Sequence, residues 1–333
     1  MKKLLLLLLL TSSLCLENTF SQNQGNIWYF GENAGINFNS GTPVALTNSA
    51  MNTIEGCASI STPNGHILFY TNGITVYDST HVAMPNGTGL LGDESSTQSS
   101  IVVPNPQSDS LYYVFTVGEN GANGLRYSEV DMSLHNGLGD IIQSSKNTLL
   151  LDENNNSMSV TEKITSVLHS DNQSYWIIAH QAATNKFYVY LIDAIAGFNT
   201  MPTAWSVGGN HVSNWGATHG CMKVSPGGEH IAVAVHSQNS SGFFEVFDFD
   251  RNTGQISNPR TASNYYRPYG VEFSPDGKKL YASSISFSPG STPSVIYQFD
   301  MEAVVFSTSA TVVHSSATDN MLGLQLGPDG KIY

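Results

Sequence analysis

Apolar residues occur along the chain in short runs that alternate with polar positions and end at turn-forming residues. The clearest example is the segment 271–281, in which Val-Glu-Phe leads into Ser-Pro-Asp-Gly and Lys-Lys-Leu-Tyr follows. Period-two alternation on both sides of a Pro, Asp and Gly turn is typical of antiparallel β-hairpins. The pattern therefore predicts an all-β protein.

The same strand-turn-strand unit recurs along the chain, with equivalent turn positions 43 to 64 residues apart. Further apolar runs follow within each unit, which gives four strands per unit. Small sheets that stack radially bury both of their faces and leave only short edges, so this period favours a β-propeller over a sandwich. We expect WD40-like, four-stranded blades, six or seven of them when complete. The remaining copies of the unit start near Ala58, Ile101, Ile164, Met222 and Leu324.

The two ends of the chain suggest how such a ring closes. Residues 26–30 and 35–38 form two strands before the first full unit, which suits a blade whose other strands come from the C-terminus. The chain stops at Tyr333, inside the second strand of its last unit. We therefore expect a propeller domain over residues 22–333 that is truncated at the C-terminus and incomplete in this chain, with two open sheet edges.

The first residues have the form of a secretory signal peptide. Lys2 and Lys3 precede seven leucines, a run too short to span a bilayer, and polar residues begin at Thr11. The small residue Ser21 suits a cleavage site, so residues 1–21 are the predicted signal peptide. The mature protein is expected to be secreted or held at the cell surface, without a membrane span.

Composition and charge exclude several classes of function. The chain is 40% hydrophobic and only 12% charged, which excludes extensive disorder. Its 13 Lys and Arg residues face 26 Asp and Glu residues, a net charge of −13 that repels phosphate backbones. Nucleic acid is therefore excluded as a partner.

Two cysteines, Cys57 and Cys221, remain after removal of the signal peptide. Both follow a glycine at equivalent positions of different repeats, so they belong on inner strands separated by two blades. A disulfide needs Cα atoms within about 7 Å. The repeat therefore predicts two free, mostly buried thiols.

Local motifs for chemistry are missing from the sequence. It contains no Gly-x-Ser-x-Gly, no His-Glu-x-x-His, no Cys-x-x-Cys and no phosphate-binding loop. Asp248, Asp250, Asn252 and Gly254 have the spacing of a calcium loop, but no Glu occupies the twelfth position, and a plain turn explains them. We expect no catalytic residues, no metal and no cofactor.

Position within the repeat gives the candidate ligand site. Residues just before each inner strand form a ring at one mouth of a propeller channel, and counting back eight from each turn selects them. Aromatic neighbours on the same loops add faces that suit sugars or peptide side chains. The alternative is that a wet channel mouth is polar without binding anything. The candidate ligand-binding residues are Glu55, Gln98, Glu162, Trp215, His219, Tyr266, Arg267 and Asn320.

The mature chain also resembles a known family, the N-terminal propeller region of gliding-motility-associated surface proteins that are exported by type IX secretion. The resemblance implies export to the cell surface and a non-enzymatic or unknown role, with further modules and a sorting domain downstream. It implies no catalytic residues. The matching segments are 28–31, 33–35, 55–61, 68–73, 84–87, 96–99, 124–131 and 324–333.

Three functions fit these observations. The first is an adhesion or binding scaffold that presents propeller loops to an extracellular polysaccharide or protein. The second is a lactonase-like hydrolase acting at the channel mouth, because residues 267–277 are similar to an inner-strand repeat of that family. The expected His after Arg267 and an Asn-Glu pair after Tyr281 are missing, however. The third is a structural spacer without a ligand, and fold alone does not choose among them.

Overall fold

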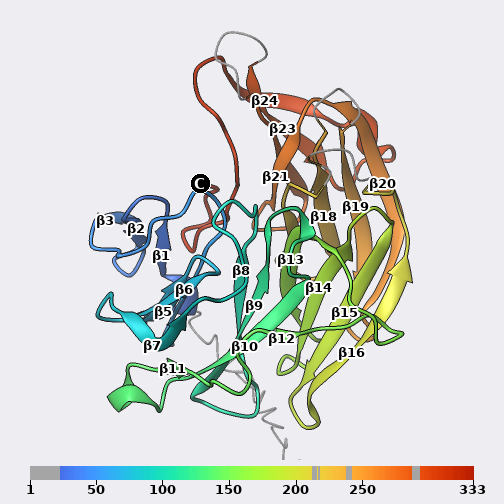
Figure 1. The fold of residues 1–333 in the computed structure, drawn as a ribbon. Coiled ribbons are helices and arrows are strands. Elements are labelled where there is room, and N and C mark those ends of the chain that lie inside the picture. Colours follow the sequence, from blue (N-terminus) through green and yellow to red (C-terminus); the bar gives the residue numbers. More distant parts are fainter. Residues whose placement is uncertain (1–22, 212–215, 217, 238–241, 287–292) are drawn as a thin grey trace, which may run out of the picture.

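The protein is described here from a computed structural model, which covers residues 23–211, 216, 218–237, 242–286 and 293–333. The predicted signal peptide, residues 1–21, lies outside the described residues. The described part of the chain forms six antiparallel sheets, which we call blades 1 to 6 in chain order. Figure 1 shows them arranged one after another around the molecule.

The strands of the first two blades have three to six residues each, and blade 3 adds two strands of seven residues. Blade 1 contains β1 (Ile27–Phe30), β2 (Ala34–Asn37) and β3 (Val44–Leu46). Blade 2 contains β4 (Ala58–Ser61), β5 (Ile67–Thr71), β6 (Thr75–Asp78) and β7 (Ala83–Thr88). Blade 3 contains β8 (Ser100–Pro104), β9 (Leu111–Val117) and β10 (Leu125–Asp131), with β11 (Asp140–Ile141) and β12 (Thr148–Leu149) both paired to β10.

The last three blades have four strands each. Blade 4 contains β13 (Val160–Leu168), β14 (Tyr175–Gln181), β15 (Lys186–Asp193) and β16 (Gly197–Ser206). Blade 5 contains β17 (Met222–Val224), β18 (His230–Val235), β19 (Gly242–Asp250) and β20 (Gln255–Tyr265). Blade 6 contains β21 (Pro268–Phe273), β22 (Lys279–Ser284), β23 (Ser294–Asp300) and β24 (Thr311–Ser316). Short 3₁₀ helices lie at Asn23–Gly25, Glu119–Gly121, His135–Gly137 and Phe306–Thr308.

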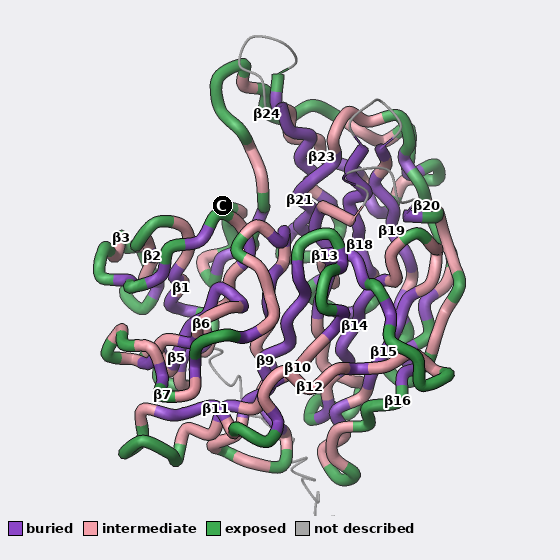
Figure 2. The backbone as a smooth tube through the Cα atoms, viewed as in Figure 1, coloured by how far each residue is buried: buried purple, intermediate pink, exposed green. Residues whose placement is uncertain are grey.

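The hydrophobic core is divided among the interfaces between successive blades. One cluster packs Val103 and Phe115 of blade 3 against Ile164 and Tyr190 of blade 4, and comparable clusters lie between the other neighbouring pairs from blade 1 to blade 6. The central strands of blades 4 and 5 are consequently buried on both faces, while the turns and the outer strands β16, β20 and β24 are largely exposed (Figure 2). This two-sided burial explains why apolar residues occupy successive positions in strands such as β15.

Residues 322–333 close the ring between blade 6 and blade 1. Ser283 on β22 donates a hydrogen bond to the Leu322 carbonyl at 2.7 Å, and Glu272 on β21 accepts one from the Leu326 amide at 3.0 Å. On the other side, the Tyr333 ring packs edge-on against Trp28, with ring centroids 5.8 Å apart. Figure 1 shows the C-terminus beside β1 to β3.

The expectation of an incomplete propeller is therefore wrong. Four-stranded blades are confirmed for blades 2, 4, 5 and 6, but the ring closes with six blades formed by this chain alone, and it is not left open between the first and last blades. The physical reason lies at the N-terminus. Residues 26–46 form a three-stranded sheet and not the two strands expected, so the C-terminal segment has only to supply the contact with β21 and β22.

Candidate functional site

A cavity of about 720 Å³ lies between blade 1, the C-terminal segment and the inner strands of blades 2 to 5. This volume falls within the range of typical small-molecule sites. Aromatic side chains line it from the β1 side and from the chain end, and polar side chains line it from the inner strands. The lining residues include Trp28, Glu55, Thr97, Gln98, Ser100, Cys221, Lys223 and Tyr333.

Glu162, on β13, is the centre of a buried hydrogen-bond network behind this cavity. Its Oε2 accepts hydrogen bonds from the backbone amide and the hydroxyl of Thr97, both at 2.8 Å. Its Oε1 accepts one from the Asn120 amide at 3.0 Å and lies 3.4 Å from His219 Nε2. Because its side chain is fully buried and already bonded, Glu162 holds the loops of blades 3, 4 and 5 together and has no free face for a ligand.

Gln98 links two blades that are not neighbours. Its carboxamide donates to the Met222 carbonyl at 3.1 Å and accepts from the Met222 amide at 2.8 Å. The side chain therefore reaches from the start of β8, in blade 3, to β17, in blade 5. Both ends of the amide are used by these bonds, so Gln98 lines the cavity as a structural cross-link.

Glu55 differs from Glu162 because its carboxyl lines the cavity. Burial raises the pKa of Glu55 to about 7, with the nearby negative Glu162 adding to the rise and the Tyr269 hydroxyl partly opposing it. Close by on β8, the Ser100 hydroxyl is buried and has no hydrogen-bond partner among the described residues. Glu55 thus offers the cavity a carboxyl that can bond to a ligand, whereas the Ser100 hydroxyl is too deeply buried to reach one.

The other candidate residues from the sequence lie elsewhere. Arg267 adopts a left-handed backbone conformation, with φ of 47°, and its guanidinium stacks 5.1 Å from the ring centroid of the adjacent Tyr266. Neither side chain lines the cavity. Trp215 lies outside the described residues.

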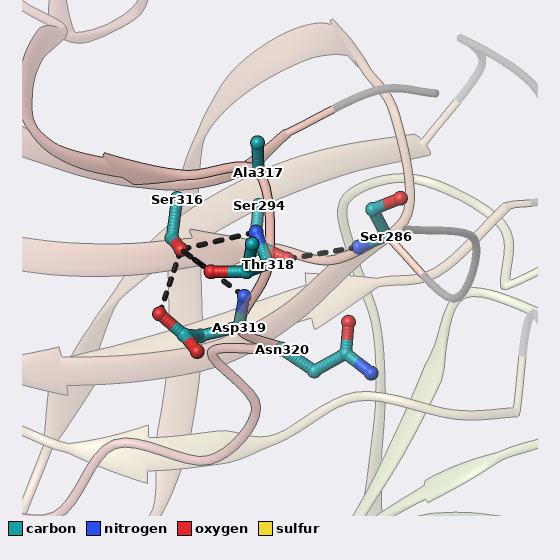
Figure 3. A pocket seen from close by; sticks show the side chains of 7 residues that line it. All are labelled: Ser286, Ser294, Ser316, Ala317, Thr318, Asp319 and Asn320. Atoms are coloured by element: carbon teal, nitrogen blue, oxygen red, sulfur yellow. Dashed lines mark hydrogen bonds between the residues drawn. The ribbon is translucent and has the colours of Figure 1, made fainter. Parts of the chain in front are cut away.

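Asn320 lines a separate, small pocket on blade 6 with Ser286, Ser294 and Ser316 (Figure 3). There Ser316 donates a hydrogen bond to Asp319 at 2.8 Å, whereas the Asn320 amide is joined to none of the residues drawn. Residues 317–321 cross from the outer strand β24 toward the C-terminal segment. Asn320 therefore lies away from the channel mouth, where counting back eight residues from the last turn had predicted it. The structure thus brings together Glu55, Gln98, Glu162 and His219, and leaves Tyr266, Arg267 and Asn320 apart.

Sequence reasoning missed a cluster of basic side chains buried beside Glu162. Lys163 donates from Nζ to the carbonyls of Thr218 and His219, and burial lowers the pKa of Lys163 to about 7. His180 and His211 stack with ring centroids 3.5 Å apart, and their ring nitrogens have no hydrogen-bond partner within the described part of the chain. The polar triplet 161–163 inside an apolar strand was the signal that could have revealed this cluster.

Cys57 and Cys221 are both free thiols, as the repeat predicted, and both line the cavity. Cys221 is buried and Cys57 is partly so. Burial raises the pKa of Cys57 to about 12 and that of Cys221 to about 11.

These thiols should react slowly in the folded protein. Because the thiolate is the reactive form, we expect modification by a disulfide reagent at pH 8 to be at least about 100-fold slower than for a small free thiol. The measurement is the absorbance of the released chromophore with time. Unfolding in guanidinium should release two fast-reacting thiols, and fast labelling of the native protein would contradict the burial of both side chains.

Among the described residues, no group of three or more His, Cys, Asp or Glu side chains is arranged to hold a metal ion. The described helices include none with the length and apolar character needed to cross a membrane.

Comparison with known proteins gives the fold. No family model matches the sequence, and no curated protein does. Among solved structures, a candidate 6-phosphogluconolactonase from Bacteroides uniformis is 15% identical with a TM-score of 0.53, over 90% of this chain and 82% of that one. Hydrazine synthase from Kuenenia stuttgartiensis is 14% identical with a TM-score of 0.55, over 93% of this chain and 89% of that one. At such identities the likeness shows the fold alone.

Proposed function

We propose that the protein is a non-enzymatic scaffold, secreted or held at the cell surface, whose cavity binds an extracellular polysaccharide. One observation carries the proposal: the cavity is lined both by the aromatic residues Trp28 and Tyr333 and by Glu55, whose carboxyl is available to a ligand. Sugar rings present apolar faces that pack on aromatic rings and hydroxyls that bond to such polar groups. Export by type IX secretion, which the family resemblance implies, belongs to the same proposal.

The proposal is tested by direct binding. Residues 22–333 are titrated with oligosaccharide fragments of bacterial surface and plant polysaccharides, and the heat of binding is measured. For a fragment that binds, Trp28→Ala should weaken affinity at least about tenfold, because one stacking face is lost. Trp205→Ala, which removes a partly buried tryptophan on the outer strand β16, is the matched control and should leave affinity unchanged.

Glu55 adds a second, pH-dependent readout of the same site. A carboxylate accepts stronger hydrogen bonds from sugar hydroxyls than a neutral carboxyl does. With a pKa of about 7, Glu55 ionises as the pH rises, so affinity should increase roughly fivefold between pH 6 and pH 8. The Glu55→Gln variant should show no such increase. Equal affinity of the Trp28 variant and the wild type, together with a flat pH profile, would overturn the proposal.

A lactonase-like hydrolase is the alternative that an assay can separate from the scaffold. A phosphorylated lactone requires cationic groups around its phosphate. Of the Lys and Arg residues described, Lys223 alone lines the cavity, and it is already bonded to Gln325 and paired with Glu272 at 3.4 Å. Hydrolysis of 6-phosphogluconolactone above the uncatalysed rate, with or without divalent metal, would favour the enzyme and end the scaffold proposal.

A further inference from the structure

The outer strands of the blades are protected to different degrees against pairing with another chain. Proline, which donates no backbone hydrogen bond, and charged side chains are the usual protection of a sheet edge. Outer strand β7 contains Pro85, β16 contains Pro202, and β20 contains Pro259 and Arg260. The outer strands of blades 1 and 3 have only two or three residues each.

The outer strand β24 has neither protection. Its six residues, Thr311–Ser316, include no proline and no Asp, Glu, Lys or Arg. Its register against β23 is irregular after Ile296, but β16 and β20 show the same kind of irregularity, so this feature does not set β24 apart. Figure 1 shows β24 along the outside of blade 6.

The side chains around this edge are apolar and exposed. Val312 is 62% exposed and Val313 is 48% exposed, and Val304 and Val305 are exposed on the preceding turn. The stretch 303–318 contains no Asp, Glu, Lys or Arg, although the whole chain has a net charge of −13. Two copies of the chain would repel one another over most of their surfaces, and this uncharged edge is a place where they can approach without like-charge contact.

We propose that β24 is a homodimerisation edge, which pairs antiparallel with β24 of a second copy about a twofold axis beside Val312, so that the two Val312 side chains lie opposite one another. A twofold contact brings the same residues together from both copies, so an uncharged apolar strand is complementary to itself. Backbone hydrogen bonds supply the affinity, and the valines of the two strands pack across the axis. A single pair of short strands buries little surface, so the dimer is weak and forms at micromolar concentrations.

The experiment is sedimentation equilibrium of residues 22–333 at physiological salt, from about 1 to about 200 μM. The wild type should dissociate with a micromolar constant. Val312→Lys places two like charges across the axis and should raise that constant at least about tenfold. Ile195→Lys is the matched control, because Ile195 is 91% exposed on a turn of blade 4, and it should leave the constant unchanged.

A charge-complementation variant keeps the test independent of any effect on folding. Val312→Glu alone should weaken the dimer to the same extent, and mixing it with Val312→Lys should restore a mixed dimer, because opposite charges then face each other across the two strands. A wild type that is monomeric throughout the range would overturn the proposal. So would a dimer weakened equally by Val312→Lys and Ile195→Lys.

Discussion

Replacing Glu162 by alanine should lower the free energy of unfolding by about 3–5 kcal/mol. The substitution removes the acceptor of three hydrogen bonds at once, from the amide and hydroxyl of Thr97 and from the amide of Asn120. The two Thr97 bonds are buried, so their loss leaves buried donors without a partner, which is the costly part of the substitution. The measurement is urea unfolding followed by far-ultraviolet circular dichroism and by tryptophan fluorescence.

Two further variants make the result specific. Glu162→Gln keeps the shape and one acceptor oxygen, so it should fall between the wild type and Glu162→Ala. Glu153→Ala removes a carboxylate whose salt bridge to Lys186, at 2.8 Å, is partly exposed to solvent, and it should cost at most about 1 kcal/mol. If Glu162→Ala costs no more than Glu153→Ala, the network around Glu162 does not hold the three blades together.

The blades could be predicted from the sequence because their signals are local. Each hairpin carries its own turn residues and its own alternation, as in segment 271–281, and these need no information from elsewhere in the chain. Closure of the ring depends on contacts between residues about 300 positions apart, such as the Tyr333 ring on Trp28. No local pattern encodes such a contact, and for that reason the sequence predicted an open ring where the structure has a closed one.

The candidate site could be predicted in part for a similar reason. Counting back from the turn found Glu55, Gln98 and Glu162, because the loops before β4 and β8 and the first residues of β13 lead directly to the axis. The sequence could not show that Gln98 and Glu162 are already bonded within the protein, since their partners lie on other blades. A side chain that is already bonded within the protein cannot bond to a ligand. Of these three residues, Glu55 therefore is the one whose side chain remains available for ligand binding.

The stacked pair His180 and His211 should make the protein sensitive to mild acid. Burial, with nearby Lys163 adding to its effect, holds the pKa of both rings well below the ordinary value of 6.5. His236 is also buried and its pKa is lowered to about 3. In the unfolded chain these rings take up protons below about pH 6.5, whereas in the folded protein they stay neutral. Stability therefore falls as the pH drops through this range.

For the stacked pair we expect a loss of about 4 kcal/mol between pH 7 and pH 5, since each unprotonated ring costs about 1.4 kcal/mol per pH unit below 6.5. Glu55 has the opposite effect on stability, because its raised pKa lets the folded protein bind an extra proton below about pH 7.

The double variant His180→Phe and His211→Phe isolates the effect of the pair. It keeps two stacked rings and removes the ring nitrogens, so its free energy of unfolding should fall by about 4 kcal/mol less than that of the wild type between pH 7 and pH 5. Urea unfolding at pH 5, 6 and 7 measures the difference, with His66→Gln as the exposed control. An unchanged acid dependence in the double variant would show that these rings are protonated in the folded protein, which contradicts their burial without partners.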